Sequence, residues 1–223
     1  MEQLAQPWGE IALYHDFANR IWQGQLPYKD FFPEYPPLSL FFFWIADVFG
    51  TQWFTIIYYM LITIFVFLLI ILIQKKQGNP YIFLASVLPL GGLFWDRFDI
   101  FPAFFAFLSL YLVRKNIVLS SLSLGIGIMI KIFPLAFLPI IFFQAWKQGK
   151  LLVSIFTLSM IIALTIIPIL VYGGSFGKFI EFQGKRGIQI ESFRATPLLI
   201  QALLGKKEVI VEYKHYTYEV REK

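Results

Sequence analysis

Three charged residues, Asp96, Arg97 and Asp99, stand between two apolar runs, residues 81–94 and 100–113. An ionic group inside a membrane costs several kcal/mol unless it reaches water or a partner, so we expect these charges at a membrane–water boundary and interpret them as part of a functional site. Their carboxylates can accept a proton, and the guanidinium can hold a phosphate through two parallel hydrogen bonds. A plain turn between two helices would carry the same charges, and the position of the other polar residues decides between the two interpretations.

Lys131 is a further candidate for phosphate binding. It follows the uncharged run 117–130, so its ammonium is expected at the end of a helix, at the depth of lipid headgroup phosphates. Two alternatives remain open at this point. Lys131 can be a snorkelling lysine that only anchors the helix end, and Arg97 can simply pair with Asp96 or Asp99.

The composition indicates the elements that must position these residues. Hydrophobic residues make up 58% of the chain and charged residues only 15%, against about 25% in globular proteins, which indicates an integral membrane protein. Residues 53–73 form the most secure predicted span, because residues 52–74 carry no charge over a length that crosses a hydrocarbon core of about 30 Å. We therefore predict an all-α bundle of about six transmembrane helices. The other candidate spans are residues 81–95, 98–113, 117–130, 133–146 and 151–172.

The two ends of the chain are expected to lie outside this bundle. Residues 10–23 have the spacing of an amphipathic interfacial helix, and residues 38–49 are too short for a confident span and read as a re-entrant or interfacial helix. We also predict a surface helix at 194–204 and a strand or hairpin at 209–220. The expected parts of one membrane domain are a first extracytoplasmic loop (1–50), the helix bundle (51–172) and an extracytoplasmic loop with a β segment (173–223).

The lysines and arginines predict the orientation of the bundle. Lys75 and Lys76, Arg114 and Lys115, and Lys147 and Lys150 occupy every second turn without an acidic neighbour, which marks that face as cytoplasmic. The remaining turns then lie outside the cytoplasm. They gather Glu10, Asp16, Glu34, Asp96, Arg97, Asp99, Lys131, Lys185, Arg186 and Glu191 on one face.

This orientation puts the first 36 residues outside as well. We therefore expect either a preceding span or export signal, so that the chain is truncated, or a membrane crossing by residues 38–49.

Several classes of site are not indicated by the sequence. The chain has no cysteine, and His15 and His215 lie far apart, so no metal site is predicted and no cofactor is expected. The net charge of +5 is spread over membrane loops without a basic patch interleaved with aromatics, so we expect no nucleic acid partner. The lipid bilayer, with its phosphate-bearing lipids, is the more suitable acidic partner.

Six short motifs resemble those of bacterial GT-C glycosyltransferases, and most closely glycosyltransferase family 87, the polyprenol-phosphate-mannose-dependent mannosyltransferases. They occur in the order found in that family. The motifs are EIALY (10–14), GQLPYKDF (24–31), EYPPL (34–38), RFD (97–99), KIFPL (131–135) and RGIQIES (186–192).

The resemblance implies a multi-span enzyme whose first outer loop carries a catalytic carboxylate. The family's catalytic aspartate falls just before the Ile-Ala-Leu-Tyr stretch, where this chain has Glu10, so Glu10 is our first choice for the general base, followed by Glu34 and Asp99. The residues matched to the donor phosphate are Arg97, Lys131 and Arg186. The residues expected to line the substrate are Tyr14, Tyr28, Tyr35, Asp96, Gln189 and Glu191.

The aromatic loop from Tyr28 to Tyr35 can stack against a sugar ring, or it can anchor the chain at the membrane interface. Family members usually have a span before this loop and several more after the Glu-Ser motif, so the resemblance implies a fragment that covers the amino-terminal half of such an enzyme.

These expectations combine into one function and two alternatives. We predict transfer of a hexose, mannose by resemblance, from a polyprenyl-phosphate donor to a glycolipid or glycan acceptor on the extracytoplasmic face of the plasma membrane. A transporter or flippase of lipid-linked sugars can bind the phosphate with the same cations and needs no general base. A non-catalytic membrane subunit needs neither the phosphate-binding cations nor the base. Polar groups gathered at the ends of spans, rather than at the midplane, favour the enzyme over the transporter.

Overall fold

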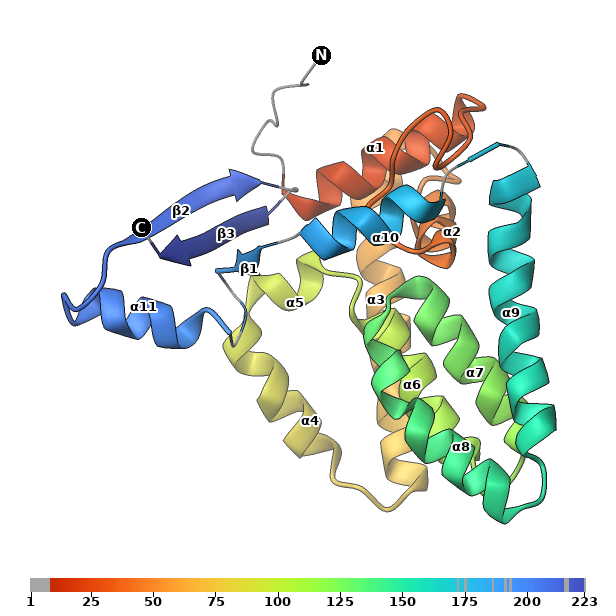
Figure 1. Cartoon of the computed structure of the whole chain (residues 1–223). Helices are drawn as coiled ribbons and strands as arrows, with labels where there is room; N and C mark the ends of the chain where they lie inside the picture. Colours follow the sequence, from red (N-terminus) through yellow and green to blue (C-terminus); the bar gives the residue numbers. More distant parts are fainter. Residues whose placement is uncertain are drawn as a thin grey trace. The chain divides into compact units, whose positions relative to one another are not determined.

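The computed structural model describes residues 9–171, 173–174, 176–185, 187–190, 192, 194–214 and 217–222. The chain divides into two compact units (Figure 1). We call Trp8–Ser175 the helical unit, and Met1–Pro7 together with Phe176–Lys223 the C-terminal unit.

Two short helices open the helical unit and pack against each other. Helix α1 (Glu10–Trp22) confirms the helix predicted at 10–23, and Gly24 follows it with a φ of 78°, which allows a chain reversal that only glycine adopts easily. Helix α2 (Pro37–Ala46) begins with a proline in its first turn, where the missing N–H is not needed. The predicted helix at 38–49 therefore exists and is ten residues long.

Two of the described helices are long and apolar enough to cross a membrane. Helix α3 (Phe54–Lys75), preceded by the 3₁₀ turn η1 (Thr51–Trp53), corresponds to the span predicted at 53–73. Helix α9 (Leu151–Val171) corresponds to the span predicted at 151–172. Only 17% and 18% of their most apolar windows is buried inside the structure, as suits contact with lipid.

The other apolar helices are shorter than a typical span, so the prediction of about six membrane crossings remains a prediction. The segment 81–95 is not one helix, because Pro89 and the positive φ of Gly91 interrupt it. The segment 133–146 starts as a 3₁₀ turn and becomes α-helical at Leu138. These elements are α4 (Pro80–Val87), η2 (Leu88–Leu90), α5 (Gly92–Asp96), α6 (Ile100–Leu112), α7 (Ile117–Ile130), η3 (Phe133–Phe137) and α8 (Leu138–Lys147).

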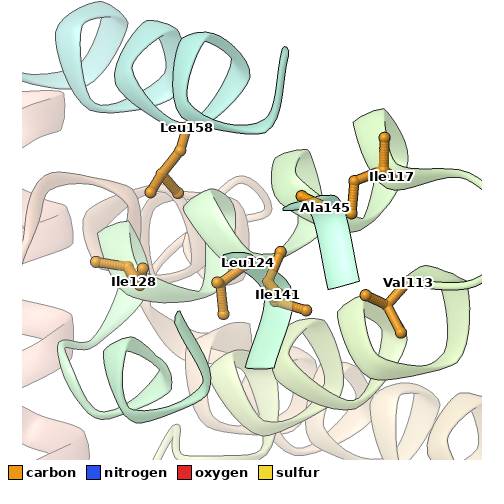
Figure 2. Close-up of a cluster of buried hydrophobic side chains, with 7 residues drawn as sticks. All are labelled: Val113, Ile117, Leu124, Ile128, Ile141, Ala145 and Leu158. Carbon is orange, nitrogen blue, oxygen red and sulfur yellow. The ribbon is translucent and has the colours of Figure 1, made fainter. Parts of the chain in front are cut away.

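Helix α7 lies at the centre of the helical unit, where it packs against α6, α8 and α9. Leu124 is completely buried, and Figure 2 shows it beside Ile141 of α8, in a cluster to which α9 also contributes Leu158 and the end of α6 contributes Val113. The core cluster consists of Val113, Ile117, Leu124, Ile128, Ile141, Ala145 and Leu158.

Buried hydroxyl groups also join α7 to its neighbours. The hydroxyl of Ser120 lies 3.2 Å from that of Ser109 on α6, and the hydroxyl of Ser121 lies 2.6 Å from that of Ser154 on α9. Small residues let the helices approach closely, because a Cβ added at Gly125 would lie 3.2 Å from the Cβ of Ile161. Helix α7 is thus held by both apolar and polar contacts.

The C-terminal unit contains a three-stranded antiparallel sheet of order β1-β3-β2. The strands confirm the β segment predicted at 209–220, and helix α11 corresponds to the helix predicted at 194–204. Helix α10 was not predicted. The elements are α10 (Phe176–Lys185), β1 (Ile188–Gln189), α11 (Thr196–Leu203), β2 (Val209–Lys214) and β3 (Thr217–Glu222).

Candidate functional site

Glu10 and Arg97 meet at one end of the helical unit. The Arg97 Nη2 atom lies 3.3 Å from Glu10 Oε1, and both side chains are partly exposed, at 21% and 27%. The other carboxylate oxygen, Oε2, accepts a hydrogen bond from the Tyr14 hydroxyl and lies 3.4 Å from the hydroxyl of Tyr35. Glu10 is therefore a carboxylate with a cation on one oxygen, hydroxyl donors on the other, and access to solvent.

Local structure explains how these groups come together. Glu10 and Tyr14 lie one turn apart on the same face of α1, so the hydroxyl reaches the carboxylate within a single helix. Glu10 is also in the first turn of the helix, where the helix dipole favours a negative charge. Arg97 follows α5 in an extended conformation, with φ of −106° and ψ of 140°, which turns the chain towards α6. The contact with Glu10 shows that Arg97 does not pair only within its own turn.

Aromatic rings form a packed floor beneath the carboxylate. The ring of Tyr14 stacks on Phe43 at a centroid distance of 4.3 Å and meets the edge of Phe98 at 5.4 Å. All three residues are completely buried. Burial, together with the neighbouring Tyr35 hydroxyl and the Glu10 carboxylate, raises the pKa of Tyr14 well above its ordinary value. The Tyr14 hydroxyl therefore stays protonated and remains a hydrogen-bond donor to Glu10.

Tyr28 and Tyr35 fix the loop between α1 and α2. The Tyr28 hydroxyl donates a hydrogen bond to the carbonyl oxygen of Tyr35 at 2.5 Å. Tyr28 has a φ of 65°, a conformation that non-glycine residues rarely adopt. The residues are only 4% and 6% exposed, so neither ring offers an open face to a sugar in this structure. Their contacts indicate that the rings shape the loop that carries Tyr35 to Glu10.

A second ion pair joins the start of α6 to the end of α7. The Lys131 ammonium contacts the Asp99 carboxylate and lies 4.9 Å from the centroid of the Phe98 ring. The Lys131 and Asp99 side chains are 30% and 44% exposed. Lys131 is thus held by residues of the site rather than by membrane anchoring alone. Phe98 therefore contacts both this ion pair and Tyr14 of the aromatic floor under Glu10.

Asp96 and Glu34 lie close to the same site. The hydroxyl of Tyr59 on α3 donates a hydrogen bond to Asp96 Oδ1 at 3.3 Å, and the hydroxyl of Tyr58 lies 3.4 Å from the Asp96 carbonyl oxygen. Glu34 is only 1% exposed. Burial, and next the charge of Glu34, raises the pKa of Tyr35. Asp96 therefore ties α3 to the site, whereas Glu34 lies beneath the surface.

The remaining predicted site residues belong to the C-terminal unit. Arg186 and Glu191 lie outside the described residues. Gln189 lies in β1, where it pairs with Glu219 of β3. No group of three or more potential metal ligands gathers among the residues that the structure describes.

Sequence reasoning missed a buried acid close to α1. The Asp47 Oδ1 atom lies 3.6 Å from His15 Nε2, and Asp47 is 5% exposed. Burial raises the pKa of Asp47, and the neighbouring His15 opposes this shift. The signal was present in the sequence, because Asp47 is the first charge after the apolar residues of α2.

The sequence matches the model of a known protein family. The model of glycosyltransferase family 87 matches residues 32–211, which is most of the chain. The chain belongs to glycosyltransferase family 87. It is therefore a membrane glycosyltransferase, in agreement with the two long apolar helices. The curated proteins and the solved structures gave no match.

The family 87 match covers only part of the candidate site. Glu34, Asp96, Arg97, Asp99 and Lys131 all lie inside the matched residues. Glu10, Tyr14 and Tyr28 precede them. The assignment of these three residues to the site therefore rests on the contacts of α1 and its following loop with Arg97 and Phe98.

Proposed function

We propose that this family 87 protein transfers a hexose, with mannose as the first candidate, from a polyprenyl-phosphate donor to a hydroxyl group of a glycolipid or glycan. The observation that carries the proposal is the 3.3 Å contact between Glu10 and Arg97. It brings a proton acceptor and a phosphate-binding cation together at one solvent-accessible place. Sugar transfer from a lipid phosphate needs both groups side by side.

The reaction assigns a role to each of them. The acceptor oxygen attacks the anomeric carbon of the donor sugar, the bond from this carbon to the phosphate oxygen breaks, and its electron pair stays on the phosphate. The acceptor proton passes to the Glu10 carboxylate, which acts as the general base. The departing phosphate gains one negative charge, which the guanidinium of Arg97 and the ammonium of Lys131 stabilise.

The resting ion pair suggests how the base becomes available. A donor phosphate competes with the Glu10 carboxylate for the guanidinium, because both anions can accept two parallel hydrogen bonds from its planar fork. When the phosphate binds Arg97, the carboxylate is released towards the acceptor hydroxyl. Tyr14, whose hydroxyl contacts Oε2, holds the carboxylate in place during this exchange.

Contacts at both ends of the helices support an extracytoplasmic site. At the site end, α3 meets Asp96, and a Cβ added at Gly174, just after α9, would lie 3.4 Å from the Tyr28 Cβ. At the other end, α3 and α9 carry the basic turns that contain Lys76 and Lys150. Basic turns are typical of the cytoplasmic face, so the site belongs on the opposite face of the plasma membrane.

The test replaces Glu10 with Gln and measures mannose transfer from polyprenyl-phosphate-mannose in proteoliposomes, together with donor binding. We expect turnover to fall by about 10² to 10⁴-fold, because the general base is lost, while donor binding persists. A transporter would move the lipid-linked sugar equally well after this change. Turnover close to that of the unmodified protein would overturn the proposal.

Asp16→Asn is the matched control. Asp16 lies on the same helix and forms an exposed ion pair with Arg20 at 2.7 Å, so its loss should leave turnover unchanged. Donors that differ only in the sugar, such as the mannosyl and glucosyl polyprenyl phosphates, identify the transferred hexose. Transfer from a nucleotide sugar and not from the lipid phosphate would overturn the donor assignment.

A further inference from the structure

A group of cations occupies the end of the helical unit that lies away from the candidate site. Three chain segments contribute to it: the end of α3, the turn after α6 and the turn between α8 and α9. In Figure 1 the end of α3 and the α8–α9 turn both lie at the lower edge of the helical unit. We call this surface the basic rim, and its cations are Lys75, Lys76, Arg114, Lys115, Lys147 and Lys150.

Side-chain contacts join the three segments of the basic rim. The ammonium of Lys76, the residue after α3, lies 5.4 Å from the centroid of the Tyr111 ring of α6. The Lys115 ammonium lies 4.1 Å from the same centroid and donates a hydrogen bond to the Tyr111 hydroxyl at 2.8 Å. The amide of Gln148, in the α8–α9 turn, donates a hydrogen bond to the carbonyl oxygen of Val113 at 2.8 Å. The cations therefore form one surface rather than three separate turns.

The charge of the basic rim is not balanced by acidic residues of the neighbouring chain. No aspartate or glutamate occurs between Asp47 and Asp96 or between Asp99 and Glu181, and these two stretches contain the whole rim. The candidate site differs, because each of its cations Arg97 and Lys131 contacts a carboxylate. A concentrated positive surface without acids attracts external anions.

The surroundings of the rim indicate which anion it meets. Exposed apolar side chains precede the cations on the same helices, with Ile71 one turn before Lys75 on α3 and Trp146 directly before Lys147 on α8. Exposed tryptophan beside lysine is typical of the level of lipid headgroups. Anionic phospholipids present a phosphate to the cations and acyl chains to the apolar residues, so they complement both parts of the surface.

We propose that the basic rim binds anionic phospholipid headgroups, with Lys76 and Lys115 as the central contacts. Both ammonium groups, one just after α3 and the other just after α6, lie near the ring of Tyr111. Headgroup phosphates bound there can therefore engage both segments. The proposal concerns a surface separate from the candidate site and does not depend on sugar transfer.

The test measures lipid selectivity of the full chain in phosphatidylcholine bilayers. Spin-labelled phosphatidylglycerol and spin-labelled phosphatidylcholine are compared as the motionally restricted lipid at the protein surface. We expect a selectivity for phosphatidylglycerol of about threefold or more, which falls to near unity in the double variant Lys76→Gln, Lys115→Gln. Equal selectivity in the double variant and the unmodified protein would overturn the proposal.

Two further variants keep this test decisive. The charge-conserving variant Lys76→Arg, Lys115→Arg should retain the selectivity, which separates the loss of charge from a folding defect. The variant Lys29→Gln, Lys206→Gln makes the same change of net charge at exposed positions outside the rim and should also retain it. If the rim only sets membrane orientation, no variant changes the selectivity. Competition by inorganic phosphate at equal concentration would identify a site for free phosphate and overturn the lipid assignment.

Discussion

The Tyr28 hydroxyl donates a hydrogen bond to the carbonyl oxygen of Tyr35 at 2.5 Å, and the Tyr35 hydroxyl in turn lies 3.4 Å from Glu10 Oε2. The loop that joins α1 to α2 thus holds the Tyr35 hydroxyl close to Glu10, the proposed general base. The backbone N–H of Tyr28 also donates to the carbonyl of Phe31 at 2.8 Å, which closes the loop despite the unusual φ of Tyr28.

Tyr28→Phe should test this support. The change leaves the buried carbonyl of Tyr35 without its hydroxyl donor, so we expect a loss of about 1 kcal/mol of stability. Turnover should fall while KM for the donor stays constant, because the phosphate-binding residues are untouched. Burial raises the pKa of Tyr28, so its hydroxyl donates at every accessible pH and the stability deficit should not vary between about pH 5 and 9. A deficit that changes with pH would contradict this role.

Arg97→Lys should separate the charge of this side chain from its geometry. Lysine keeps the positive charge but cannot form two parallel hydrogen bonds to a phosphate. We expect KM for the lipid-phosphate donor to rise about tenfold, which corresponds to about 1.4 kcal/mol, as measured by initial rates. Arg20→Lys on α1 is the control, because Arg20 pairs with the exposed Asp16 and also contacts Gln25 and the Phe31 ring, none of which is assigned to the donor phosphate. Equal effects of the two changes would argue against phosphate binding by Arg97.

Gly125→Ala should destabilise the helical unit. The added Cβ would lie 3.2 Å from the Cβ of Ile161 and 3.3 Å from a Cδ1 atom of Leu158, so α7 and α9 would have to separate. Overpacking of this kind costs about 1 to 3 kcal/mol. Alanine has the better helix propensity, which offsets at most about 1 kcal/mol of this cost. The net effect is therefore destabilising because α9 is packed too closely to shift freely. Thermal unfolding in detergent measures the difference. Gly184→Ala in α10 is the control and should not destabilise, because its Cβ meets nothing within 4 Å.

Asp47→Asn should reveal the cost of a buried acid. Burial raises the pKa of Asp47 in the folded chain, so at neutral pH the ionised carboxylate costs folding free energy, and this cost disappears as the pH falls through the folded-state pKa. We therefore expect the variant to unfold at a higher temperature than the unmodified protein at pH 7. The difference should shrink near pH 4. A less stable variant at pH 7 would mean that the contact with His15 outweighs the burial.

Periodicity and charge predicted much of this fold. The apolar runs of α3, α7 and α9 gave their positions to within a few residues, because uncharged stretches bounded by lysine or asparagine leave little choice. The run 81–95 was misread as one helix, since its hydropathy does not register the break at Gly91. Helix α10 was missed because it lies among glycines and polar residues of the kind that commonly form loops.

For the helical unit, the sequence predicted which charged residues lie near one another but not which of them pair. The alternation of charged turns along the chain put Glu10, Arg97, Asp99 and Lys131 on the same face of the predicted helix bundle. The partner of Arg97 could not be chosen, because Asp96 and Asp99 are closer in sequence than Glu10, and only the packing of α1 under the α5–α6 turn decides. The enclosed position of Tyr28 depends on tertiary contacts in the same way.

The serine contacts along α7 have a consequence for the distance between the two phosphate-binding cations. Lys131 ends α7, and Arg97 precedes α6, so sliding of α7 along α6 would change the gap between them. The bond from the Ser120 hydroxyl to the Ser109 carbonyl oxygen at 2.8 Å can form at only one longitudinal alignment, because the next turn of helix lies about 5.4 Å away. The buried serine hydroxyls between α6 and α7 thus fix the distance between Arg97 and Lys131 at the end of the bundle.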